Sequence, residues 1–200
     1  MSDITTLRVQ RETKPKIEDV LPYCLDGEML KSALDFVAWL RANKMNPVWA
    51  GVHNQWKHTY KGTGLYVINL RATDPNIIKL RTADSNEEEK KWTVEPYLKN
   101  ISKYNDSIIN EGLQTYIWNN VGYCRHVLMG DCNFHGCAPG MSKTIAGKEF
   151  KNICLAHAGI GRRVMVAHDP DKNTIDCIKK LLEFERKARL DEHNIKKQGK

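Results

Sequence analysis

The chain has 200 residues, of which 41% are hydrophobic and 28% are charged, and these values are typical of a globular domain. The mean hydropathy is −0.54, and no stretch approaches the roughly 18 consecutive apolar residues that a membrane span requires. Residues 1–8 lack the apolar stretch of a secretory signal. These features exclude a membrane-spanning protein and predict a cytoplasmic location.

The net charge of +7 and the pI of about 9.1 are compatible with an anionic partner such as nucleic acid. Residues 172–200 hold nine Lys or Arg residues against five Asp or Glu residues, so most of the excess charge lies there. The strands predicted below contain no basic run and no base-stacking motif. We therefore expect a solvated basic face, and a nucleic-acid-binding module is the weaker alternative.

The first 25 residues are polar and turn-like, and they contain Pro15 and Pro22, so we expect an N-terminal arm. Asp26 is a suitable N-cap for a helix from about Glu28 to Asn43. Apolar residues recur along it with the three-to-four spacing of a buried helical stripe. This stripe consists of Met29, Leu30, Ala33, Leu34, Val37 and Leu40.

Beyond this helix the sequence predicts a meander of antiparallel strands, because β-branched and aromatic residues alternate with polar ones. The expected strands are 48–52, 56–60, 65–70, 77–81 and 91–94, with a glycine-rich turn at 61–64. Asp106 can begin a helix that continues to Trp118. Residues 163–167 are an expected edge strand, and Asp171 or Asn173 can cap a final helix.

This order of elements predicts an α+β fold: a curved antiparallel sheet with helices packed on one side and a long loop rich in Cys and Gly. We expect a single α+β domain over residues 26–193, preceded by the arm at 1–25. Residues 194–200 are an expected disordered basic tail.

The aromatic residues of the strands are the first candidate site. Strand alternation places Trp56, His58 and Tyr60 on one face. Such a face can line a pocket for a flat aromatic or cationic small molecule, although packing in a filled core is the competing interpretation. The predicted ligand-binding residues are Trp49, Trp56, His58, Tyr60, Tyr66 and Trp92.

The second candidate site is the glycine-rich segment 121–154, which contains four of the six cysteines. Zinc prefers four thiolate or imidazole ligands within a turn-rich loop. The candidate metal ligands are Cys124, Cys132, His135, Cys137 and Cys154. Two alternatives stay open: the thiols are buried core residues, or the segment is the centre of a metal- or thiol-dependent enzyme that uses Cys132, His135 and Cys137. Cys177, on the apolar side of the last helix, fits the core interpretation.

Four elements resemble those of small bacterial proteins that are loosely similar to YdhG-like and GyrI-like α+β domains: the first helix and the segments 54–62, 147–150 and 169–171. The resemblance implies a curved antiparallel sheet that holds a small ligand, and it assigns no catalytic residue. GyrI-like domains carry a buried acidic residue in the pocket, which would be Glu95 or Glu111 here. The leading hypothesis is therefore a small-molecule-binding protein, with its oligomeric state left open.

Overall fold

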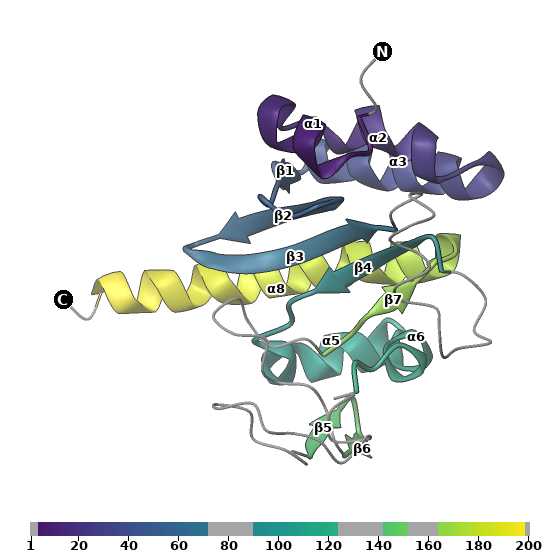
Figure 1. Ribbon diagram of the computed structural model, residues 1–200. Coiled ribbons are helices and arrows are strands. Elements are labelled where there is room, and N and C mark those ends of the chain that lie inside the picture. Colours follow the sequence, from purple (N-terminus) through teal and green to yellow (C-terminus); the bar gives the residue numbers. More distant parts are fainter. Residues whose placement is uncertain (1–3, 72–89, 124–141, 152–163, 199–200) are drawn as a thin grey trace, which may run out of the picture. The chain divides into compact units, whose positions relative to one another are not determined.

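The structure is a computed structural model that describes residues 4–71, 90–123, 142–151 and 164–198 (Figure 1). The described helices are α1 (Leu7–Thr13), α2 (Ile17–Cys24), α3 (Gly27–Ala42), the 3₁₀ helix η1 (Ile101–Tyr104), α5 (Asn105–Asn110), α6 (Gln114–Asn119) and α8 (Lys172–Gln198). The described strands are β1 (Val48–Trp49), β2 (Gln55–Tyr60), β3 (Thr63–Leu70), β4 (Trp92–Pro96), β5 (Lys143–Ile145), β6 (Lys148–Phe150) and β7 (Ala167–His168). The predicted strand at 77–81 lies outside the described residues, as does most of the Cys/Gly-rich segment 121–154. The described part of that segment includes strands β5 and β6, where an irregular loop was expected.

The main sheet has five strands in the order β1-β2-β3-β4-β7, and β5 and β6 form a separate two-stranded sheet. Val48 pairs with Lys57 in the antiparallel β1–β2 ladder. Lys61 and Gly62, at the turn between β2 and β3, both have positive φ (51° and 78°), as a tight two-residue hairpin requires. Helices and an antiparallel sheet together confirm the predicted α+β fold.

Contacts along the chain divide it into two compact units, which we describe separately. The first unit comprises Met1–His58, Val67–Val94 and His168–Ile175. The second unit comprises Thr59–Tyr66, Glu95–Ala167 and Asp176–Lys200. The boundaries of the single domain expected from the sequence stay a prediction.

In the first unit, α1 and α2 occupy the region that the sequence predicted to be an arm. Contacts with distant residues hold them: the Trp56 indole Nε1 donates to the Pro15 carbonyl over 3.0 Å, and α1 is bonded to Asn54 through Gln10. Helices this short are stabilised mainly by such tertiary contacts, which explains why the polar sequence did not reveal them. The predicted helix at 28–43 is confirmed as α3, which buries Ala33, Phe36, Val37 and Leu40.

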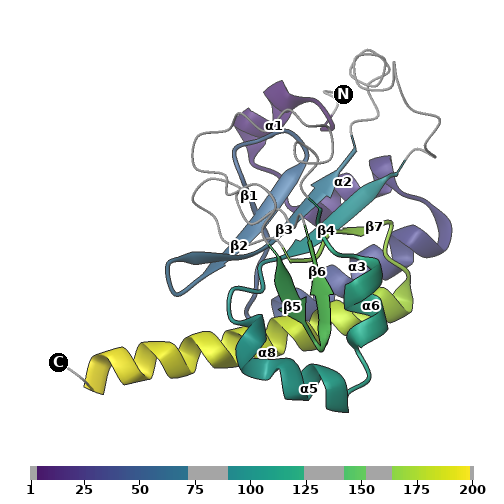
Figure 2. The same cartoon turned by 90° about the horizontal axis from the view of Figure 1, so that it is seen from below.

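In the second unit, the single helix expected after Asp106 is divided into α5 and α6. Gly112 lies between them with a φ of +66°, which is incompatible with a continuing right-handed helix. The indole of Trp118 in α6 donates to the carbonyl oxygen of Ile145 over 2.9 Å. This bond attaches the β5–β6 hairpin to α6, beside which it lies in Figure 2.

The long helix α8 begins after Asp171, whose carboxylate accepts a hydrogen bond of 2.8 Å from the backbone N–H of Thr174, as expected of an N-cap. The helix continues to Gln198, so residues 194–198 are helical where a disordered tail was expected. The correction has a simple cause, because extending a helix that tertiary packing has already formed costs little. Among the described helices, none is both long enough and apolar enough to cross a bilayer.

Candidate functional site

A buried polar network joins α1 to the turn that precedes β2. The side-chain oxygen Oε1 of Gln10 accepts hydrogen bonds from the Asn54 backbone N–H (2.9 Å) and from the Trp49 indole Nε1 (3.3 Å). Neither group can act as an acceptor. These two donors therefore fix which end of the Gln10 amide is the oxygen, a point that side-chain shape alone leaves open.

The orientation of Gln10 in turn fixes that of Asn54. Gln10 Nε2 donates to the Ile4 carbonyl (3.1 Å) and to Asn54 Oδ1 (2.5 Å). Asn54 therefore presents its oxygen to Gln10 and its Nδ2 amino group on the other side. Asn54 is 1% exposed, and within the described residues Nδ2 has no hydrogen-bond partner. The network thus ends in a buried donor.

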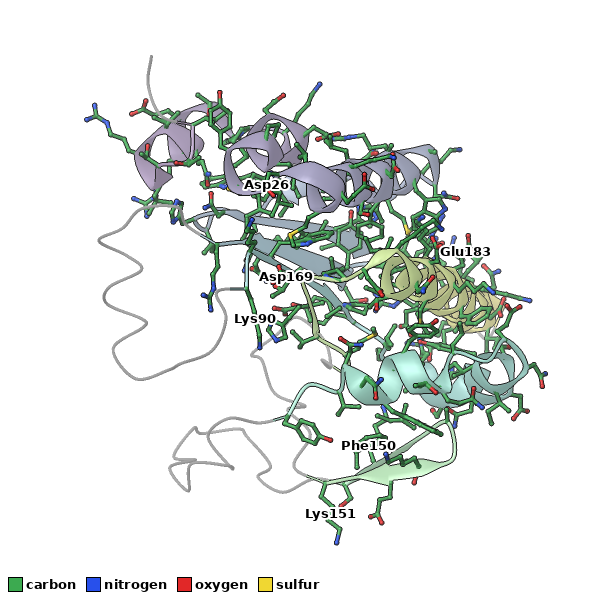
Figure 3. All side chains as sticks on the ribbon, turned by 90° about the vertical axis from the view of Figure 1, so that its right-hand side faces the viewer. Asp26, Lys90, Phe150, Lys151, Asp169 and Glu183 are labelled. Atoms are coloured by element: carbon green, nitrogen blue, oxygen red, sulfur yellow. The ribbon has the colours of Figure 1, made fainter. Side chains whose placement is uncertain are left out.

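Trp92, at the start of β4, supplies a second buried donor. Its side chain is 1% exposed, and its indole Nε1 likewise has no partner in the part of the chain that the structure describes. The backbone of Trp92 is held firmly: its N–H donates to Asp169 Oδ1 (2.9 Å), and its carbonyl accepts from the Asp169 N–H (3.0 Å). Figure 3 shows Asp169 close to Lys90 at this end of the strand.

The two donors belong to one row across the sheet. The Leu70 N–H donates to the Asn54 carbonyl (2.8 Å), and the Arg71 N–H donates to the Lys91 carbonyl (2.9 Å). Antiparallel pairing then places Leu70 opposite Asn54 on one side and opposite Trp92 on the other. We call Asn54, Leu70 and Trp92 the donor row.

Both donors lie on the same side of the sheet. The Gln10–Asn54 bonds show that the Asn54 side chain faces α1. By strand alternation Trp92 and Leu70 share a face with Trp56, whose indole contacts Pro15 between α1 and α2. In the sheet, Leu70 therefore lies between the two residues that carry the buried N–H donors.

The turn beside Asn54 is open to solvent. Gly51 has a φ of +80°, and Val52 is 53% exposed. His53 is half-buried, and its Nε2 lies 2.5 Å from the carbonyl oxygen of Thr5. Since a carbonyl oxygen only accepts, this nitrogen carries the proton. The turn is the solvent-facing edge of the network.

The predicted ligand-binding residues are divided between the two units. In the first unit Trp56 and Trp92 are buried, whereas Trp49 and His58 are half-buried. In the second unit Tyr66 is buried, and half-buried Tyr60 lies under the guanidinium of Arg186 at 5.3 Å from the ring centre. The role of this set in ligand binding stays a prediction.

Sequence reasoning did not single out Gln10 or Asn54. They are 44 residues apart, and neither belongs to a motif, so only the folded chain brings their amides together. The identity of Asn54 was a weak signal for a turn, because asparagine is the usual non-glycine residue at positive φ. The backbone φ of Asn54 is 51°. Of the acids named through the family resemblance, Glu95 is buried, whereas Glu111 forms a surface ion pair with Lys180.

The five candidate metal ligands, Cys124, Cys132, His135, Cys137 and Cys154, all lie outside the described residues. Among the described residues no group of three or more His, Cys, Asp or Glu side chains could hold a metal ion. Cys177 is 2% exposed, which confirms its expected place in the core. Burial raises the pKa of its thiol to about 12, so this cysteine is unreactive at neutral pH.

The second unit contains a contrasting buried network around Glu185 and Arg189 of α8. The Glu185 carboxylate accepts from Arg189 Nε (2.6 Å), the Asn100 N–H (3.0 Å) and the Tyr104 hydroxyl (2.8 Å). Arg189 also donates to the carbonyl oxygens of Thr63, Gly64 and Tyr97. Burial, reinforced by the charge of Glu185, raises the pKa of Tyr104 well above 10. This network is closed, because each of its charged groups meets several partners.

Comparisons of the chain with family models, with curated proteins and with solved structures found no match. The geometry of the site therefore carries the functional argument.

Proposed function

We propose that this protein binds a small planar aromatic molecule in the cytoplasm, at the donor row of the first unit. One observation carries the proposal: Asn54 Nδ2 and Trp92 Nε1 are buried N–H donors without a partner among the described residues. Burying an unsatisfied donor costs about 1–3 kcal/mol, and native proteins rarely retain such groups without a reason. A bound ligand would supply the missing acceptors.

The surroundings favour a flat aromatic ligand. Trp49 and Trp92 provide aromatic surface near the two donors, and Leu70, between the two donor residues in the sheet, provides apolar surface. Small-molecule sites commonly combine an apolar lining with a few polar groups that fix orientation. The exposed turn at 50–53 gives a solvent-facing edge from which a ligand can enter.

Two buried tryptophans on this face form a matched pair for testing the proposal. Trp56→Phe removes an N–H that is bonded to the Pro15 carbonyl and leaves that carbonyl without its donor. Trp92→Phe removes an N–H that has no partner among the residues that the structure describes. The loss of ring volume is the same in both. We expect Trp56→Phe to lower the free energy of unfolding by about 1–2 kcal/mol more than Trp92→Phe does. Urea denaturation measures the difference.

Ligand binding is measured on Trp92→Phe and a control variant, with a thermal-shift panel of planar aromatic compounds and quenching of tryptophan fluorescence. A ligand that binds only the folded state raises the melting temperature. We expect Trp92→Phe to weaken binding. The control Trp118→Phe, in the second unit, should bind as the wild type does. Equal destabilisation by Trp56→Phe and Trp92→Phe, together with no stabilising compound, would contradict the proposed function.

We also propose that the cysteine-rich segment holds zinc through Cys132, Cys137, Cys154 and either His135 or Cys124. The sequence supports this, because a long glycine-rich segment with clustered thiols gains order from a metal. Elemental analysis of protein purified without added metal should find about one zinc per chain. A metal-free protein whose melting temperature does not change with a chelator would eliminate the site. Two alternatives would then remain: buried core thiols, and a thiol-dependent enzyme centred on this segment.

A further inference from the structure

We infer that the ligand of the donor row is a neutral or anionic planar heterocycle with hydrogen-bond acceptors at two opposite edges, and not a cation. This inference rests on the proposed function and names its ligand class. It follows from the hydrogen-bonding role of Asn54 Nδ2 and Trp92 Nε1. Each of these buried groups can donate a hydrogen bond and cannot accept one.

At Trp92 the polarity is intrinsic, because an indole N–H can only donate. At Asn54 it is set by a chain of bonds. The Trp49 indole and the Asn54 backbone N–H together fix the oxygen of Gln10, and the Gln10 amino group then engages Asn54 Oδ1. Only the amino group of Asn54 is left, so the site offers N–H groups at both positions.

The spacing of the donors defines the ligand further. Asn54 and Trp92 belong to strands on either side of β3, and adjacent strands are about 4.8 Å apart, so their backbones are roughly 10 Å apart. A fused bicyclic ring with one acceptor at each of two opposite edges can satisfy a pair of donors at this spacing. Carbonyl oxygens and unprotonated ring nitrogens are suitable acceptors. A protonated ring nitrogen or an amino cation would meet an N–H group at each end, and the donors would stay unsatisfied.

Two probes that share a fused pair of six-membered rings test this inference. 1,5-Naphthyridine presents only ring-nitrogen acceptors on opposite edges, whereas 4-aminoquinoline is protonated at neutral pH and presents N–H donors. We expect 1,5-naphthyridine to bind the wild type at least about tenfold more tightly, as measured by fluorescence titration and thermal shift. Trp92→Phe should remove most of this preference, while Trp118→Phe, which removes an indole N–H bonded to the Ile145 carbonyl in the second unit, should keep it.

Asn54→Asp is a sharper variant, because the aspartate keeps an oxygen for Gln10 and replaces the amino group with a second acceptor. We expect its preference to shift toward 4-aminoquinoline. Should this variant fail to fold, the comparison of Trp92→Phe with Trp118→Phe decides the question alone.

The outcomes separate the inference from the proposed function. Tighter binding of 4-aminoquinoline to the wild type, or equal binding of both probes, would overturn the acceptor inference and leave small-molecule binding in place. Binding of neither probe would also overturn it. The proposed function is judged independently, by the relative stabilities of Trp92→Phe and Trp56→Phe and by the wider compound panel.

Discussion

The two buried networks differ in one respect: the Glu185–Arg189 network is saturated with partners, and the Gln10–Asn54 network is not. Arg189 donates to four separate residues, and each carboxylate oxygen of Glu185 accepts at least two hydrogen bonds. In the Gln10–Asn54 network the bonds stop at Asn54, whose amino group is buried without a partner in the described part of the chain. A saturated network has no capacity left for a ligand, so its role is structural. An unsaturated one retains that capacity.

The largest expected effect breaks the closed network. Arg189→Met leaves the buried carboxylate of Glu185 without its cation and three carbonyl oxygens without a donor. Removing one partner of a buried ion pair typically costs about 3–5 kcal/mol, and we expect a loss of that size in urea denaturation. The double variant Glu185→Leu/Arg189→Met should recover part of the loss. A loss below about 1 kcal/mol in the single variant would show that this network does not hold the second unit together.

A smaller effect is expected from removing the anchor of the open network. Gln10→Leu leaves the Trp49 indole and the Asn54 backbone N–H without their acceptor. We expect a loss of about 1–3 kcal/mol, less than for Arg189→Met, because only neutral groups lose partners. Thr13→Ala, in the same helix, is a control in which an exposed hydroxyl loses only its bond to the Val9 carbonyl. Equal stability of the Gln10→Leu and Thr13→Ala proteins would contradict the buried network.

A third prediction uses a partly exposed Glu–Arg pair to sharpen the contrast with the buried one. Glu18 receives hydrogen bonds from Arg41, which lower its pKa below the ordinary value of 4.5. A lowered folded-state pKa adds stability that is present above the unfolded-state pKa and is lost as the pH falls through the folded-state pKa. We expect Glu18→Gln to cost about 0.5–1 kcal/mol at pH 7 and almost nothing at pH 2, measured by urea denaturation at both values. An equal loss at both pH values would exclude the ionic contribution.

The smallest effect is expected where α8 leaves the core. In residues 194–197 every side chain is exposed, and Ile195 is 69% exposed. Deleting residues 194–200 should change the free energy of unfolding by less than about 0.5 kcal/mol, because the side chains of residues 194–197 are exposed. A loss of several degrees in melting temperature would instead show that this part of the helix packs against something.

Periodic patterns predicted the parts of the fold that depend on local sequence. The stripe in α3, the Lys61–Gly62 hairpin and the Asp171 cap each follow from residues within a few positions of one another. Helices α1 and α2 were missed because distant residues stabilise them, through Trp56 for Pro15 and through Asn54 for Gln10. The break at Gly112 shows the opposite error, in which a continuous apolar pattern outweighed a single glycine.

The candidate site was predictable only in part. The strand pattern drew attention to Trp49 and Trp92, and both belong to the proposed site. The sequence could not identify Asn54 as a site residue. Its role depends on which atom of its side-chain amide has no hydrogen bond once Gln10 has bonded to the other atom. That asymmetry is a property of three-dimensional hydrogen bonding, and no spacing of residue types encodes it.

The closed network also constrains the order in which the molecule can be completed during synthesis. Arg189 follows Thr63, which it contacts, by 126 residues in the chain. At a translation rate of about 5–20 residues per second, the carbonyls of Thr63 and Gly64 are synthesised roughly 6–25 s before the guanidinium that binds them. During that interval the nascent strands have only water, or a chaperone, to satisfy these groups. A pause in translation just before codon 189 would lengthen the period in which this nascent chain is most prone to misfold.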